Sequence, residues 1–147
     1  MTSAEPAIAA PSRLLAAWQN MQTDGMGSTY YFYPDGLLVM QNPRRREFVV
    51  LARWRMQTRD VVVISDEQPL NTTLSRAELA KWRKGSYPWR IVSLTRRELH
   101  WVFLNDPKTS DVFRYRGPLP DRTENVYWGL GTDESYARGI RKEIGGR

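Results

Sequence analysis

The twelve residues YYFYPDGLLVMQ (30–41) decide the fold of this chain, because they place two apolar runs on either side of Asp35-Gly36. An Asp-Gly pair between apolar runs is a strong short-range signal for a β-hairpin, since both residues accept the backbone angles of a tight turn. We therefore predict paired strands over residues 28–34 and 37–42. The aromatic residues of this hairpin suit a packed core, a pocket wall or a platform for bases.

Further strands are expected along the chain. Apolar and polar side chains alternate over residues 47–57, which is typical of a strand with one buried face. That face is expected to carry Phe48, Val50, Ala52, Trp54 and Met56. The β-branched run 59–65 follows at once and is expected to pair back on this strand. The remaining strands are predicted over residues 14–21, 87–94, 98–104 and 111–116.

One helix is predicted between the strand groups, in the segment LSRAELAKWRKG (74–85). Ser75 and Glu78 match a capping box, in which each side chain bonds the backbone of the other. Basic residues fill the last turn, where the helix dipole favours cations. Gly85 is expected just past the helix end, at the C′ position. We expect this helix to cover one end of the sheet structure.

The order of the elements is a strand meander, a helix and a second meander. Strands joined by hairpins must hide their edges, and closing into a barrel does so. We predict a mainly β fold, an antiparallel up-and-down barrel of about eight strands with one short helix and a helical C-terminal tail. The 147 residues suit one domain. It comprises a disordered lead over 1–12, the barrel over 13–116, and a loop and short helix over 117–147, the helix at 133–144.

The placement of aromatic residues along the predicted strands resembles that of the small bacterial lipocalin-like (calycin-type) domains. The matching residues lie within roughly 14–116 and are Trp18, Phe32, Asp35, Gly36, Trp54, Trp89, Ile91, Leu94, Leu99 and Trp101. The resemblance implies a cup-shaped barrel that holds a small, mostly apolar molecule. In that family an arginine of the last strand caps the tryptophan of the first, which implies that Arg114 or Arg116 contacts Trp18.

Non-catalytic binding of a small apolar or aromatic ligand is therefore the predicted function. The residues predicted to line the pocket, by shape and stacking, are Phe32, Trp54, Trp89, Trp101 and Tyr115. Alternation places them on inward faces together with Phe48 and Phe103. An eight-stranded barrel is just wide enough to be filled by its own side chains or to hold one small ligand. The same rings therefore suit a filled core equally.

Two other classes of function stay open. A protein-binding module, such as an inhibitor, an immunity protein or an envelope scaffold, would use Arg44, Arg45 and Arg46 on an acidic partner, because guanidinium forks match carboxylates. An OB-like binder of single-stranded nucleic acid would stack bases on rings and follow the backbone with arginines. Alternation counts against the second class, because it places Trp54 and the arginines beside it on opposite faces.

The residue types restrict the chemistry further. The chain has no cysteine, which excludes disulfides, thiolate metal sites and a cysteine nucleophile. His100 is the only histidine, and no glycine-rich phosphate loop or nucleophile elbow is present. Asp66 and Glu67 are expected to be solvated loop residues. Catalysis therefore has no named residues, and no metal or other cofactor is indicated.

The net charge of +6 is spread along the chain, as for a solvated surface rich in arginine. No run approaches the length of a transmembrane helix, and no secretory signal is expected in the chain as given. The Ala/Pro/Ser-rich lead is of a kind that often follows a cleavage site. The sequence is thus compatible both with an exported and with a cytoplasmic location.

Overall fold

The computed structural model describes residues 8–21, 27–42, 44, 49–70 and 73–120. The predictions that fall on Arg45, Arg46, Phe48, the first seven residues and the helix at 133–144 lie outside these residues. The strands are β1 (Ala17–Asn20), β2 (Thr29–Phe32), β3 (Leu37–Gln41), β4 (Val49–Met56), β5 (Val61–Pro69), β6 (Ser86–Leu94), β7 (Glu98–Phe103) and β8 (Asp106–Gly117). A 3-10 turn, η1 (Ser12–Leu14), precedes β1, and the helix α2 (Arg76–Lys84) lies between β5 and β6.

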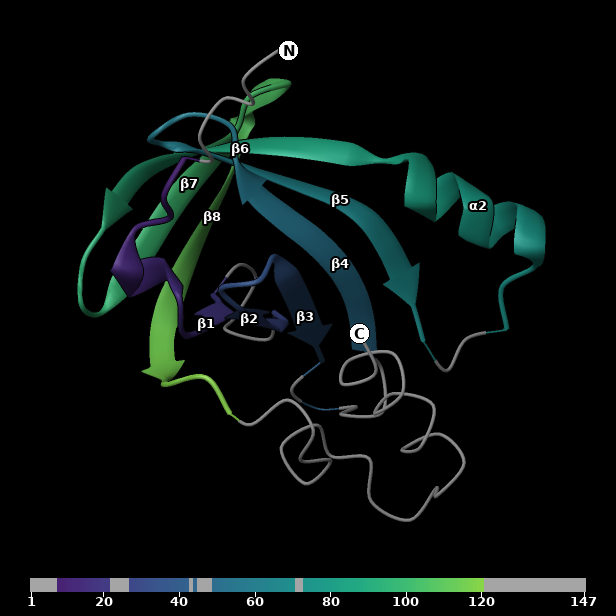
Figure 1. Ribbon diagram of the computed structural model, residues 1–147, viewed down its shortest axis with the longest axis horizontal. Helices are drawn as coiled ribbons and strands as arrows, with labels where there is room; N and C mark the ends of the chain where they lie inside the picture. Colours follow the sequence, from purple (N-terminus) through teal and green to yellow (C-terminus); the bar gives the residue numbers. More distant parts are fainter. Residues whose placement is uncertain (1–7, 22–26, 43, 45–48, 71–72, 121–147) are drawn as a thin grey trace, which may run out of the picture.

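The strands form a closed antiparallel barrel in the order of the sequence, β1 to β8 (Figure 1). Each strand pairs with the next, and β1 closes the barrel by pairing with β8, with Trp18 opposite Tyr115. Closure removes the free edges that an open sheet would expose. The predicted fold class is confirmed, and the barrel is compatible with a lipocalin-like architecture.

The hairpin at Asp35-Gly36 forms as predicted. Gly36 has a φ of 93°, a value that side-chain-bearing residues rarely adopt. Its amide donates to the Tyr33 carbonyl at 3.1 Å, and the Tyr33 amide donates to the Leu37 carbonyl at 2.9 Å. Beyond this turn, Phe32 pairs with Leu38 and the two strands run in register.

The interior of the barrel is a cluster of apolar side chains. Its fully buried members include Trp18, Phe32, Leu38, Leu99, Trp101 and Phe113, and Ala52, Trp54, Met56, Val62 and Ile64 complete the contacts between β4 and β5. Partly buried Trp89, Ile91 and Leu94 pack against it from β6. A bulge between Ile91 and Ser93 shifts the register of β6, so that Leu94 contacts the core after it.

A second buried cluster covers the outside of the barrel. It was not predicted, because the sequence pattern of β4 indicated only one buried face. It contains Tyr33, Leu37, Val39, Val49 and Leu51, with Leu70 and Leu119 packed against it. Val39 alternates along β3 with Leu38 of the interior, so it faces outward. The chain after β8 helps to cover this face, because the Tyr33 hydroxyl donates to the Pro120 carbonyl at 2.9 Å. Strands β3 and β4 are therefore buried on both faces.

Helix α2 has the predicted capping box: Ser75 accepts from the Glu78 amide at 3.2 Å, and Glu78 accepts from the Ser75 amide at 3.4 Å. The prediction for Gly85 is wrong in detail, since it is the C-cap residue in an extended conformation with φ −65°. A side chain at Gly85 would have to displace the ring of Tyr87. The helix packs against β5, yet none of its residues is buried (Figure 1).

The alternating strand directions define two ends of the barrel. At one end lie η1 and the turns at 33–36, 57–60 and 95–97, and we call it the basic end after Arg13, Arg59, Arg96 and Arg97, which these segments contain. At the other lie α2, the last residues of β3, the first residues of β4 and the turn at 104–105, and we call it the helix end. Among the described residues, no helix has the length and apolar character needed to cross a membrane.

Candidate ligand-binding clefts at the two ends of the barrel

Four of the five rings predicted to line a pocket meet inside the barrel, but they pack on one another. Phe32 contacts Trp54 edge-on at 5.5 Å between ring centroids, and Trp101 contacts Phe32 at 6.1 Å. Trp89 stacks on Trp101 at 5.2 Å. Rings in such mutual contact fill the space that they surround. These four residues therefore form core contacts, and a ligand role for them stays a prediction.

Tyr115 lies on the inner face of the sheet, opposite Trp18 in the strand register, but it is not enclosed by the core. Its side chain is 42% exposed, whereas Phe113 of the same strand is fully buried. The reason is its position: β8 reaches the basic end at this residue, and there the Trp18 ring already fills the inside of the barrel. Tyr115 instead packs edge-on against Trp18, with centroids 5.5 Å apart and planes at 72°.

The interior also holds polar groups, each with a partner. The Trp101 indole donates to the Asp111 carboxylate at 3.1 Å, and Asp111 is only 5% exposed. The Trp54 indole donates to the carbonyls of Tyr33 and Leu37 at 2.9 and 3.1 Å. Burial raises the pKa of the Tyr30 hydroxyl, and the charges of Asp111 and Glu67 raise it further. Buried polar groups satisfied in this way fix the side chains around them.

Glu67 is a residue whose setting the sequence did not reveal. The expectation that Asp66 and Glu67 are loop residues is wrong, because both lie within β5. The pairing of β4 with β5 shifts between Leu51 and Arg53, and Asp66 opposite this bulge has a φ of 53°. The bulge leaves Asp66 exposed and Glu67 partly buried, and burial raises the pKa of the Glu67 carboxyl. The sequence signal for this change within the strand was the polar run SDEQ (65–68), which follows four β-branched residues.

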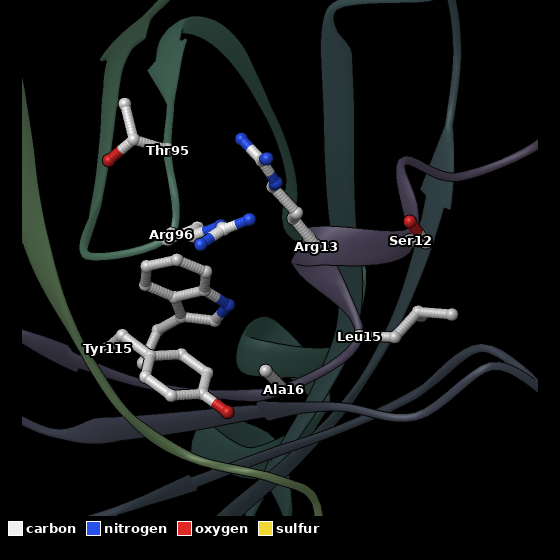
Figure 2. Close-up of a pocket in the computed structure, with 8 residues that line it drawn as sticks. Ser12, Arg13, Leu15, Ala16, Thr95, Arg96 and Tyr115 are labelled. Carbon is white, nitrogen blue, oxygen red and sulfur yellow. The ribbon is translucent and has the colours of Figure 1, made fainter.

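A cleft of about 350 Å³ opens at the basic end (Figure 2). It is lined by Ser12, Arg13, Leu15, Ala16, Trp18, Thr95, Arg96 and Tyr115. These residues come from η1 and β1, from the β6–β7 turn and from the end of β8. This cleft could not be predicted from the sequence, because the three segments lie apart along the chain.

Backbone contacts hold the walls of this cleft in place. The Trp18 indole donates to the Leu14 carbonyl at 3.2 Å, which ties the segment before β1 to the barrel. In the facing turn the Thr95 amide donates to the Glu98 carbonyl at 2.8 Å. The Tyr115 amide donates to the Arg97 carbonyl at 2.9 Å and fixes that turn to β8. These bonds join the segments that line the cleft to the barrel.

The arginines beside Trp18 are not those that the family resemblance implied. Arg114 and Arg116 are exposed and line no part of the cleft, and Arg114 pairs with Gln19 in the strand register. Arg13 and Arg96 line it instead, from before β1 and from the β6–β7 turn. Figure 2 shows the Arg13 and Arg96 side chains close to each other, with Tyr115 at the opposite edge of the view.

A second cleft, of about 500 Å³, lies at the helix end. It is lined by Ser28, Met40, Asn42, Val49, Val50, Pro69, Leu70, Thr73, Leu74 and Trp82. Met40 and Val50 are partners in the pairing of β3 with β4, and Met40 also packs against the interior cluster. Trp82 of α2 is 40% exposed and closes the cleft from the side of the helix. Among the residues that the structure describes, its lining is mainly apolar and includes no charged side chain.

Arg44 and Trp54, which were named for the alternative functions, line neither cleft. Arg44 follows β3 as an exposed residue, and its amide donates to the Asn42 side chain at 2.9 Å. On β4, Trp54 is buried while Arg55 is exposed, so ring and charge face opposite ways as predicted. This arrangement does not offer the combined aromatic and basic face on which nucleic-acid bases stack.

Within the part of the chain that the structure describes, no group of three or more acidic, histidine or cysteine side chains is placed to hold a metal ion. Comparisons with models of protein families, with curated proteins and with solved structures found no match.

Proposed function

We propose that this protein is a lipocalin-like, non-catalytic binding protein that holds a small apolar or aromatic ligand in the helix-end cleft. The observation that carries the proposal is the cleft itself, about 500 Å³ in volume and lined mainly by apolar side chains. Binding pockets for small molecules typically measure about 300–1,000 Å³ and combine apolar walls with a few polar groups. The ring contacts inside the barrel favour a site at its end over a site at its centre.

Residues of three elements have defined roles in this proposal. Met40 and Val50, at the facing ends of β3 and β4, form the floor where the cleft meets the core. Trp82 of α2 supplies a partly exposed ring as one wall. Ser28 and Thr73 at the rim supply hydroxyl groups that orient a polar part of the ligand.

A fluorescence titration with N-phenylnaphthylamine, a neutral apolar probe, tests the proposal. We expect saturable binding to the full chain and a loss of about tenfold in affinity for Trp82→Ala, because the apolar area removed corresponds to roughly 1–2 kcal/mol. No residue of α2 is buried, so the variant is expected to stay folded.

The matched control is Val92→Ala, which removes an apolar side chain that is 56% exposed on β6 and does not line the cleft. Its affinity for the probe is expected to equal that of the unchanged protein. Absence of saturable binding, or an equal loss in both variants, contradicts the proposal.

A further inference from the structure

We propose that the basic-end cleft is a second binding site, selective for small aromatic carboxylates. In this site Arg13 and Arg96 hold the carboxylate, and Tyr115 and Leu15 contact the ring. The site differs from the helix-end cleft in position and in chemistry, and it does not depend on the function proposed above.

The charge of the cleft is the first argument. Arg13 and Arg96 form no ion pair and no side-chain hydrogen bond with any residue that the structure describes. The nearby carboxylate of Asp60 is engaged elsewhere, with Arg90 at 3.6 Å. Two cations on one cleft without a neutralising acid create a local positive potential that attracts an anion. Guanidinium groups bind carboxylates through paired, charge-assisted hydrogen bonds.

The apolar surface beside these charges is the second argument. Tyr115 is 42% exposed, and its edge-on contact with the buried Trp18 ring holds it in position. Leu15 and Ala16 continue this surface toward η1. An aromatic ring laid on Tyr115 would bury apolar area while its carboxylate reaches the arginines. Such a combination of ring and charge distinguishes an aromatic acid from an inorganic anion.

The size and rigidity of the cleft are the third argument. Its volume of about 350 Å³ suits a small molecule, and it is smaller than the cleft at the helix end. The walls are fixed by the bonds from the Trp18 indole to the Leu14 carbonyl and from the Tyr115 amide to the Arg97 carbonyl. A ligand therefore does not have to order the backbone around it, which lowers the cost of binding.

Isothermal titration calorimetry with naphthoate and naphthamide tests the inference on the full chain. The two probes share the same rings, and only naphthoate carries a charge. We expect naphthoate to bind with one-to-one stoichiometry and naphthamide to bind at least about tenfold more weakly, because hydrogen bonds to a charged group are worth about 1.5–3 kcal/mol.

Three arginine variants locate the site. Arg13→Gln and Arg96→Gln are each expected to lower naphthoate affinity by about tenfold. Both side chains are exposed, so thermal unfolding of the two variants is expected to match that of the unchanged protein. Arg114→Gln is the matched control, because Arg114 precedes Tyr115 on β8 but lies outside the cleft. Its affinity for naphthoate is expected to be unchanged.

Three other results would each overturn the inference. An equal loss in Arg114→Gln and Arg96→Gln would mean that the overall positive charge, not this cleft, attracts the anion. Equal binding of naphthoate and naphthamide would remove the role of the two arginines. No measurable binding of naphthoate to the full chain would remove the site.

Discussion

The two ends of the barrel differ in chemistry although one barrel connects them. At the basic end, Arg13 and Arg96 stand beside the rings of Trp18 and Tyr115. At the helix end, the described lining of the cleft is mainly apolar and without charged side chains, and a helix with no buried residue forms one side of it. Between the ends, the aromatic rings contact one another and occupy the interior. A barrel filled in this way offers binding sites at its ends, and each end then acquires its own selectivity.

The largest expected effect separates the core from the clefts. Trp101 is fully buried and bonded to Asp111, so Trp101→Ala is expected to cost about 3–5 kcal/mol in the free energy of unfolding, measured by urea denaturation. Trp82→Ala, at the exposed helix surface, is expected to cost less than about 0.5 kcal/mol. The core assignment fails if Trp101→Ala keeps its stability and loses affinity for N-phenylnaphthylamine.

A smaller effect is expected at the cap of α2. Ser75→Ala removes the side-chain bond to the Glu78 amide, at a cost of about 1 kcal/mol to the helix. Because no helix residue is buried, we expect the loss to act locally, as faster amide hydrogen exchange in α2 with unchanged exchange in β3 and β4. Equal acceleration in the strands would show that the helix end is not a separate unit of stability.

The smallest effect is a change in pH dependence at Glu67. Burial raises the pKa of this carboxyl above its ordinary value of 4.5, so the folded state holds the proton more tightly than the unfolded state. The free energy of unfolding therefore falls as pH rises from about 4.5 through the raised pKa. Glu67→Gln is expected to remove this decline, measured as urea midpoints from about pH 4 to about pH 7. Parallel pH profiles for the two proteins would mean that Glu67 is fully solvated.

Local signals in the sequence predicted the strands, the hairpin and the helix cap. The Asp35-Gly36 turn and the capping box of Ser75 and Glu78 depend on neighbouring residues only, and both formed as predicted. Alternation also placed Phe32, Trp54 and Trp101 inside the barrel.

The clefts depend on contacts between segments that are distant along the chain, and such contacts could not be predicted from the sequence. Arg13 and Arg96 meet Tyr115 only because β1 closes on β8 and the β6–β7 turn lies at the same end. Alternation placed Tyr115 on the inner face beside Trp18, but its exposure was not predicted, because periodicity does not tell where a strand leaves the core. The bulge at Asp66 was not predicted either, since a single residue with positive φ reverses the alternation after it.

The indole resonances in a proton–nitrogen correlation spectrum test the central claim, a filled barrel with a distinct cleft at each end, most directly. Each tryptophan reports on its own location. We predict that N-phenylnaphthylamine shifts the Trp82 signal and naphthoate shifts the Trp18 signal, while the signals of Trp54 and Trp101 stay in place with both. Shifts concentrated at Trp54 and Trp101 would contradict the account, because they would place the ligand at the centre of a hollow barrel.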